Sequence, residues 1–412
     1  MKRGMVRIAL LAGAIALGAQ NLSAQEDKPL APGWLSLDSS VGVLDGAIGS
    51  GKGALEKALG ITTGAYLDAS YTWSSNHPRA PQNISGRYFD LDHNKVVFNN
   101  FHLFVEKPEK DWGVGFRVSG DFGRTGELLH ETTLWNRNGP KFCCASSAEV
   151  REAFLTTTIP LGEGIGVKGG LFVTTIGTEI MPNPGAYNDN ISRSFLFNFS
   201  IPLRHLGVSF SYPFAKTLNA SAAVVTGWDN PRDNNHSPSI LGTITYTPTD
   251  TVTLVSGIIA GEEGTFADPN RDTARWAWST VLTLKPMDPL TLYLEYTLGH
   301  QHNGSLGGTR NAAWQGVAGI ASWNWTERFN TAFRGEFFND RDGFRLGGTP
   351  SGSHANVTLS EFTLTGSYKF TKMLLGRAEV RQDFANEPFY RRGSASADSS
   401  QTTLALQLLY TF

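Results

Sequence analysis

The chain ends in the stretch Gln401-Thr-Thr-Leu-Ala-Leu-Gln-Leu-Leu-Tyr-Thr-Phe412, in which large apolar side chains recur at every second position. These are Leu404, Leu406, Leu408, Tyr410 and Phe412, and the residues between them include Thr403, Ala405, Gln407 and Thr411. Successive side chains of a β-strand point to opposite faces, so this spacing gives a strand one apolar and one mainly polar face. The stretch therefore predicts a strand that separates an apolar environment from a polar one.

The same alternation recurs along the chain from Gly64 onward. In one such segment, Val114 and Phe116 alternate with Gly115 and Arg117. Sixteen segments of this kind begin near Gly64, Val96, Trp112, Glu149, Ile165, Leu206, Leu218, Ser239, Val252, Thr273, Leu290, Asn311, Phe329, Val357, Met373 and Gln401. A soluble β-sandwich can alternate too, so the pattern alone does not decide the fold.

The lengths of the connections favour a membrane barrel over a soluble sandwich. Short links, such as residues 107–111 and 371–372, alternate throughout with long ones, such as residues 122–148 and 341–356. Short turns at one end and long loops at the other are typical of outer-membrane barrels, in which closure pairs every backbone group. We therefore predict an all-β fold, a transmembrane antiparallel β-barrel of sixteen strands (range about 14 to 18), with short periplasmic turns and long extracellular loops.

Composition agrees with a barrel and argues against several other classes. Of 412 residues, 17% are charged and 11% aromatic, the net charge is -2 and the mean hydropathy is -0.20. The aromatic content argues against a disordered chain, and the lack of basic excess argues against nucleic-acid binding. Two cysteines cannot make a disulfide scaffold. The mean hydropathy of a barrel stays polar because only half of the side chains of each strand meet lipid.

The N-terminal segment is predicted to direct export. Three basic residues precede an apolar run, residues 8–19, which is shorter than the roughly 20 residues that a membrane helix needs. We expect three regions: a signal peptide at residues 1–24, a periplasmic segment with a short helix or plug at residues 25–63, and the barrel at residues 64–412.

Two parts of the chain resemble known outer-membrane proteins. The C-terminal Leu406-x-Leu408-x-Tyr410-x-Phe412 resembles the signal read by the outer-membrane assembly machinery, so Leu408, Tyr410 and Phe412 are the expected signal residues. The stretch Asn190-Ile-Ser-Arg-Ser-Phe-Leu-Phe-Asn-Phe-Ser-Ile-Pro-Leu-Arg-His-Leu-Gly207, with Val225-Thr-Gly-Trp-Asp-Asn230, is similar to the beta-barrel porin-2, or OmpL-like, family. This resemblance implies a porin in outer-membrane lipid, and likeness to other sixteen-stranded porins implies a homotrimer.

The polar faces of the strands are expected to line the lumen. A charged face is costly in lipid and stable in water, and sixteen strands enclose room for an aqueous channel. The predicted pore-lining residues are Arg117, Asp121, Glu295, Arg334, Glu336, Glu361, Lys369, Arg377, Glu379, Arg381 and Asp383. Because both signs occur in similar number, we expect weak ion selectivity and passive diffusion of small hydrophilic solutes.

The connection at residues 178–205 is too hydrophobic for an exposed loop, because it contains Phe195, Leu196, Phe197 and Phe199. In a porin-like barrel such a segment is expected to fold inward and narrow the channel. The candidate constriction residues are Asp189, Arg193 and Arg204. In the alternative reading, these phenylalanines continue a lipid-facing strand.

Two other functions stay open, a substrate-specific channel for sugars or small anions and a barrel enzyme that acts on lipids. Such an enzyme needs a serine and a histidine on the lipid-facing surface, and we expect only His102 to lie clearly within a strand. We therefore predict no catalytic residue, no cofactor and no metal site, and we interpret His300-x-His302 as a solvated loop pair. The pairing state of the adjacent Cys143 and Cys144 is left open.

Overall fold

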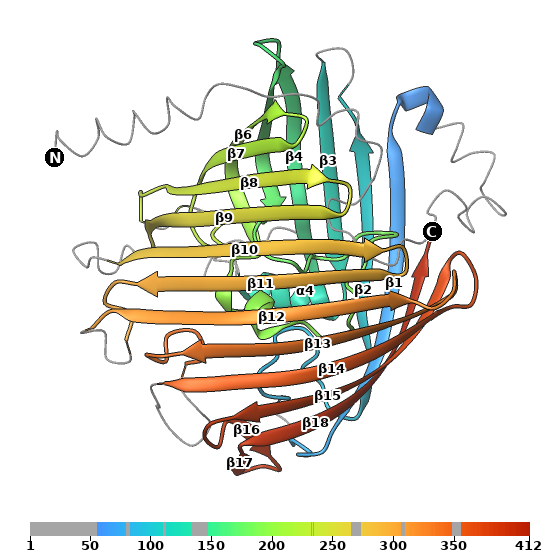
Figure 1. The fold of residues 1–412 in the computed structure, drawn as a ribbon, viewed down its shortest axis with the longest axis vertical. Helices are drawn as coiled ribbons and strands as arrows, with labels where there is room; N and C mark the ends of the chain where they lie inside the picture. Colours follow the sequence, from blue (N-terminus) through green and yellow to red (C-terminus); the bar gives the residue numbers. More distant parts are fainter. Residues whose placement is uncertain are drawn as a thin grey trace.

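The alternating segments pair into one closed sheet. The computed structural model describes residues 56–79, 83–109, 113–132, 147–231, 233, 235–264, 273–305, 310–347 and 356–412. Sixteen strands form a closed antiparallel barrel in chain order, as Figure 1 shows from blue β1 to red β18. The predicted fold class is therefore confirmed.

The barrel strands are β1 (Thr62–Ser74), β2 (Lys95–Lys107), β3 (Val114–Phe122), β4 (Ala148–Ile159), β5 (Ile165–Val173), β6 (Arg204–Ala215), β7 (Leu218–Val225), β8 (Ser239–Thr249), β9 (Val252–Glu262), β10 (Ala274–Met287), β11 (Leu290–Gln301), β12 (Ala312–Asn324), β13 (Phe329–Asp340), β14 (Val357–Lys369), β15 (Leu374–Ala385) and β18 (Ser400–Thr411). The barrel closes where β1 pairs with β18, with Tyr66 opposite Thr411. Separate from the barrel, β16 (Tyr390–Arg392) and β17 (Ser396–Asp398) form a hairpin in the connection before β18.

The strand boundaries lie close to those predicted from the alternation. Strands β9 and β13 begin at the predicted Val252 and Phe329, whereas β1 begins at Thr62, before the predicted Gly64. The chain leaves β5 at Val173, so the long connection after it starts earlier than predicted. Long and short connections alternate as expected, and we call the two ends of the barrel the long-loop end and the short-turn end.

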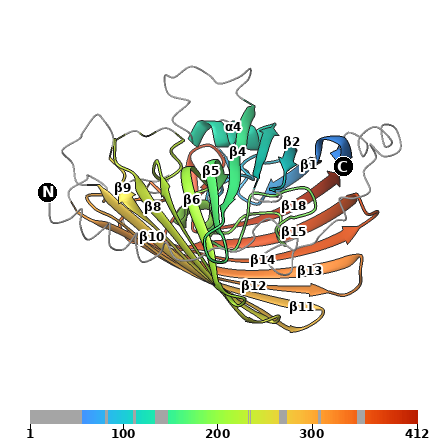
Figure 2. The ribbon, with the colours of Figure 1, turned by 90° about the horizontal axis from the view of Figure 1, so that it is seen from above.

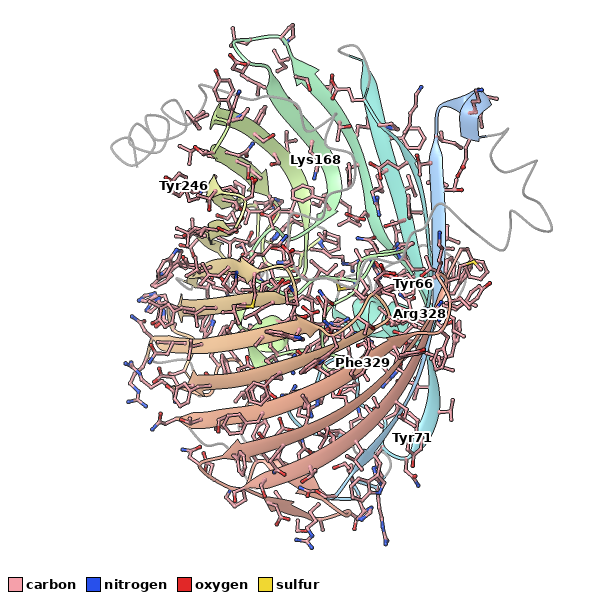
Figure 3. All side chains as sticks on the ribbon, turned by 45° about the vertical axis from the view of Figure 1, so that its right-hand side comes forward. Tyr66, Tyr71, Lys168, Tyr246, Arg328 and Phe329 are labelled. Atoms are coloured by element: carbon pink, nitrogen blue, oxygen red, sulfur yellow. The ribbon has the colours of Figure 1, made fainter. Side chains whose placement is uncertain are left out.

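The two faces of each strand differ in the way that the alternation predicts. On β18, Leu404, Leu406 and Leu408 are 48%, 59% and 55% exposed, whereas Thr403 and Gln407 are buried inside the barrel. Figure 3 shows side chains projecting outward along the whole barrel. Apolar outer side chains suit contact with lipid. In the described ranges, no helix is long and apolar enough to cross a membrane.

The connection between β5 and β6, residues 174–203, folds into the lumen, and we call it the inward loop (Figure 2). Its turn η1 (Leu196–Ser200) is a short π-helix. Phe195 and Leu196 are fully buried, and Phe197 is 3% exposed. The inward path is thus confirmed, and the alternative of a lipid-facing strand is wrong. Burial against inner residues such as Trp314 removes these apolar side chains from water.

Two short helical elements lie outside the strands. α4 (Arg124–Thr132) follows β3 and contacts β2, β3 and β4. Residues 56–59 form a helical turn before β1, where the Glu56 carboxylate accepts hydrogen bonds from the Thr63 amide (2.8 Å) and hydroxyl (2.6 Å). The predicted signal peptide and most of the N-terminal segment lie outside the described residues, as does Trp112.

Candidate functional site

Carboxylates of the barrel wall hold the inward loop by accepting backbone hydrogen bonds. Buried backbone N–H groups need partners, which an irregular segment cannot provide from its own carbonyls alone. Glu379 on β15 accepts from the amides of Ile191 (2.6 Å) and Ser192 (3.1 Å). Glu336 on β13 accepts from the amide of Phe195 and from the next amide along the chain, both at 2.6 Å. The wall thus supplies hydrogen bonds that the loop lacks.

Two further glutamates also accept hydrogen bonds from backbone amides of the inward loop. Glu295 on β11 accepts from the Thr178 amide (2.9 Å) and from the Ser279 hydroxyl (2.9 Å). Glu179, which belongs to the loop itself, accepts from the Ser194 amide (2.7 Å). The loop is therefore fixed along most of its length.

Arg334 on β13 links the wall to the loop through both charge and hydrogen bonds. Its guanidinium binds Glu361 at 2.7 Å and Glu179 at 3.1 Å, and it donates to the Ser192 carbonyl at 2.8 Å. Hydrogen bonds between ionised partners are stronger than neutral ones. The pairing also compensates the burial of these charges.

Asp383 on β15 ties two long connections to the wall. It binds Arg381 of the same strand at 2.7 Å and Arg87 of the connection between β1 and β2 at 2.9 Å. Arg381 also donates to the Arg193 carbonyl of the inward loop (2.7 Å). One cluster of charges therefore joins the first long connection, the inward loop and β15.

The predicted pore-lining residues all project from the inner face, but the inward loop and other groups inside the barrel cover most of them. The covered side chains, at most 6% exposed, are Asp121, Glu295, Arg334, Glu336, Glu361, Arg377, Glu379, Arg381 and Asp383. Arg377 donates to Gln407 (2.8 Å) and to the Asn188 carbonyl (2.6 Å). Lys369 is half-buried at the short-turn end of β14, away from these residues.

Asp121 belongs to a separate buried cluster on β1 to β4. Its carboxylate binds Arg151 (2.7 and 2.5 Å), His102 (2.9 Å) and Asn100 (2.7 Å). The Tyr66 ring stacks on His102 at 5.4 Å. His102 therefore faces the interior of the barrel, which is the opposite side from the surface where a lipid-cleaving barrel would use it.

Arg117 on β3 lies where the inward loop crosses the first strands. Its guanidinium binds Glu106 on β2 (2.5 Å) and Glu152 on β4 (3.0 Å), and it donates to the Asn183 side chain of the loop (2.9 Å). Arg117 is only half-buried, unlike the covered arginines. It therefore combines a structural contact with access to the lumen.

Two of the three constriction candidates lie in the inward loop. Asp189 is buried and accepts from the Ser322 hydroxyl on β12 (2.8 Å). Burial raises the pKa of Asp189 from its ordinary 3.8 to about 7, although the Ser322 hydrogen bond and Arg377 oppose the shift. Arg193 is half-buried, with its guanidinium 5.8 Å from the Phe197 ring. The third candidate, Arg204, begins β6 and binds Glu149 on β4 (3.2 Å).

Lys168 on β5 is an inner-wall residue outside the predicted pore-lining set (Figure 3). Its ammonium lies 4.9 Å from the Phe154 ring centroid and 5.8 Å from that of Phe172. The neighbouring inner residues Gly166 and Ser209 are small and half-buried, so the loop leaves this part of the wall uncovered. The alternation within β5 places Lys168 on the inner face, and this alternation is the sequence signal that identifies it as a wall residue.

The histidines differ from the prediction in two respects. His205 lies on β6 and His300 on β11, so His102 is not the only histidine within a strand. His300 is not in a loop, because β11 stays paired with β10 at Trp276, on which its ring stacks at 6.0 Å. Over the described ranges, no group of three His, Cys, Asp or Glu side chains is placed to hold a metal. Cys143 and Cys144 lie outside the described residues.

A closed sixteen-stranded barrel with an apolar outer surface and an inward loop is the architecture of outer-membrane porins. The outer membrane channel DcaP of Acinetobacter baumannii is similar in fold (TM-score 0.57, 12% identity, 85% of this chain and 97% of that chain). The anion-selective porin from Comamonas acidovorans is also similar in fold (TM-score 0.57, 10% identity, 85% of this chain and 99% of that chain). OprB of Pseudomonas putida is a third protein of similar fold (TM-score 0.56, 11% identity, 88% of this chain and 97% of that chain).

The sequence comparison identifies the family more closely. Residues 60–412 match the family described as beta-barrel porin-2, OmpL-like, and the chain belongs to this family of outer-membrane porins. A comparison with curated proteins finds no match.

Proposed function

We propose that small hydrophilic solutes diffuse passively through the lumen of this porin, along the part of the wall that the inward loop leaves uncovered. The observation that carries this proposal is the contrast between the two sides of the interior. The wall from β10 to β15 is buried behind the loop, whereas inner residues of β5 and β6, such as Lys168 and Ser209, are half-buried. Half-exposed polar residues suit contact with water and with dissolved solutes.

The proposed mechanism has no reacting residue. Solutes move down their concentration gradient, and the protein contributes a polar path across the hydrocarbon. The solute-facing residues we propose are Arg117, Lys168 and Arg193, because each is half-buried on the inner side. The covered charges, such as Glu379 and Arg334, instead hold the loop that sets the width of the path.

The remaining expectations concern targeting and assembly. We propose that residues 1–24 are a signal peptide and that Leu408, Tyr410 and Phe412 form the assembly signal. Leu408 projects outward, and the Tyr410 and Phe412 rings contact each other at 5.0 Å at the end of the chain. We also propose a homotrimer, which fits the similarity to OmpT of Vibrio cholerae, whose solved structures include a trimer form.

Liposome swelling tests the proposed channel. The purified protein is reconstituted into liposomes, and swelling rates are measured in sugars and amino acids of increasing size. A general diffusion channel gives rates that fall smoothly with solute size, and protein-free liposomes provide the baseline. Rates equal to that baseline for every solute would rule out the channel, whereas saturation with one solute class would favour a substrate-specific channel.

A further inference from the structure

An open pocket of about 510 Å³ lies at the long-loop end of the barrel. Its apolar lining comes from the connection after β1, the inward loop, the connection after β13 and the segment before β16, which contribute Ile84, Phe199, Leu346 and Phe389. Small-molecule sites in proteins commonly have volumes of about 300 to 1,000 Å³. The pocket is therefore large enough for a small organic ligand.

Hydrogen bonds fix the segments that form the pocket. The Arg391 amide donates to the Ser85 hydroxyl (3.0 Å), and the Gln401 side chain donates to the Ser85 carbonyl (2.9 Å). The Arg79 amide donates to the Gly393 carbonyl (3.0 Å), which joins the first connection to the hairpin of β16 and β17. A pocket with fixed walls binds a ligand at a lower entropic cost than one that must order on binding.

Two arginines line the pocket, and their partners differ. Arg87 binds Asp383 and Asp90, each at 2.9 Å, so carboxylates already compensate its charge. The side chain of Arg391 forms no ion pair with any part of the chain that the structure describes, and the residue is half-buried. Arg391 therefore gives the pocket a positive charge without a matching carboxylate.

We propose that this pocket binds a small organic monoanion, whose carboxylate pairs with Arg391 and whose apolar body lies against Phe199 and Phe389. A guanidinium can bind a carboxylate through two parallel, charge-assisted hydrogen bonds. The apolar lining favours a ligand with a ring or a short alkyl chain over a small inorganic anion, because such a ligand removes more apolar surface from water.

The pocket adjoins the segment that narrows the lumen. Phe199 belongs to η1 of the inward loop and is also part of the pocket wall. A ligand bound here would lie at the long-loop end of the barrel, and the site would raise the concentration of organic anions at that end. This role in concentrating anions rests on the proposed channel function, whereas the binding of the ligand does not.

Binding is tested with benzoate as the probe and the full-length protein refolded in detergent, by ligand-detected NMR titration. We expect saturable binding of benzoate with a dissociation constant of roughly millimolar size. Benzyl alcohol, which lacks the charge, and acetate, which lacks the ring, should each bind at least about tenfold more weakly. Lack of saturable benzoate binding, or equal binding of benzyl alcohol, would overturn the proposal.

A matched pair of variants tests whether the charge of Arg391 binds benzoate. Arg391→Gln should weaken benzoate binding by about tenfold or more. Arg392→Gln removes the same charge at the next position, from a 62% exposed side chain that binds Asp398 at 2.8 Å, and should bind benzoate like the wild type. Equal binding by the wild type and Arg391→Gln would refute the assignment.

Two further measurements keep the outcome unambiguous. Heat-modifiable mobility on gels checks that each variant is folded. If Arg391→Gln does not fold, Leu346→Glu can replace it, because it places a negative charge on another part of the pocket wall and should abolish benzoate binding. Wild-type affinity in that variant would refute the site. Benzoate binding by a protein that carries no ionic current in planar bilayers would support the pocket and contradict the channel.

Discussion

Arg334 on the barrel wall and Glu179 on the inward loop form an ion pair at 3.1 Å, and their side chains are only 0% and 4% exposed. Glu361 binds the same guanidinium at 2.7 Å. Removing one partner of a buried pair is costly, because the remaining charge stays desolvated and uncompensated. The position of the loop therefore depends on specific side-chain contacts as well as on its apolar residues.

Replacing Arg334 with Met should destabilise the barrel and release the loop. We expect the free energy of unfolding to fall by about 3 to 5 kcal/mol, as measured by urea titration in lipid vesicles. The control Arg341→Met removes a 66% exposed guanidinium that binds Asp342 at 3.1 Å, and it should cost less than about 1 kcal/mol. Equal losses in both variants would show that the buried pair does not hold the loop.

Gly316 on β12 provides the space into which η1 fits. A Cβ atom at Gly316 would lie 2.4 Å from Leu196 and 2.7 Å from the Phe337 carbonyl oxygen, whereas one at Gly319 would meet nothing nearer than 4.0 Å. We expect Gly316→Ala to displace η1 and to change the single-channel conductance. Gly319→Ala, on the same strand, should conduct like the wild type, and a wild-type conductance in both variants would contradict this role.

Shortening the inward loop should widen the path. Residues 191–201 contain η1 and the amides bound by Glu379 and Glu336. Replacing them with a short Gly-Ser linker should markedly raise the single-channel conductance in planar bilayers, because the conductance of a pore depends on its narrowest cross-section. An unchanged conductance would mean that this segment does not limit the flow of ions.

Asp189 should make stability depend on pH. Because burial raises its pKa from 3.8 to about 7, the folded protein keeps a proton that the unfolded chain releases between these values. The stability that it contributes is complete below about pH 4 and is lost as the pH rises towards 7. Asp189→Asn should remove this loss and raise stability at pH 8, measured by urea unfolding in vesicles.

The control for this pH dependence is an exposed carboxyl. Asp288→Asn, in the turn between β10 and β11, should keep the wild-type pH profile. Wild-type pH dependence in Asp189→Asn would assign the effect to other groups.

The strands could be predicted because their signal is local. Alternation has a period of two residues, so a short stretch such as residues 329–340 shows both the strand and its inner face. The inward path of Phe195 and Leu196 was likewise indicated by their hydrophobicity. Boundaries were less exact where the chain leaves a strand for tertiary reasons, as after Val173, where residues 174–203 turn into the lumen.

The partners of the inner charges could not be predicted in the same way. Alternation places Glu336 and Glu379 on the inner face, but their contacts with the inward loop depend on distant residues and on the path of an irregular segment. Alternation also cannot show whether an inner residue is covered, so Arg334 and the half-buried Lys168 could not be told apart by this signal.

The hydrogen bond between the Tyr187 and Thr411 hydroxyls (2.6 Å) joins residues 224 positions apart. Glu336 and Glu379, which hold the loop, also follow it in the chain, and the last strand completes the sheet by pairing with the first. Such distant contacts form late in folding, because a long stretch of chain must first be brought into place. The loop therefore cannot reach its final position before the C-terminal strands arrive, so narrowing of the lumen is among the last events of assembly.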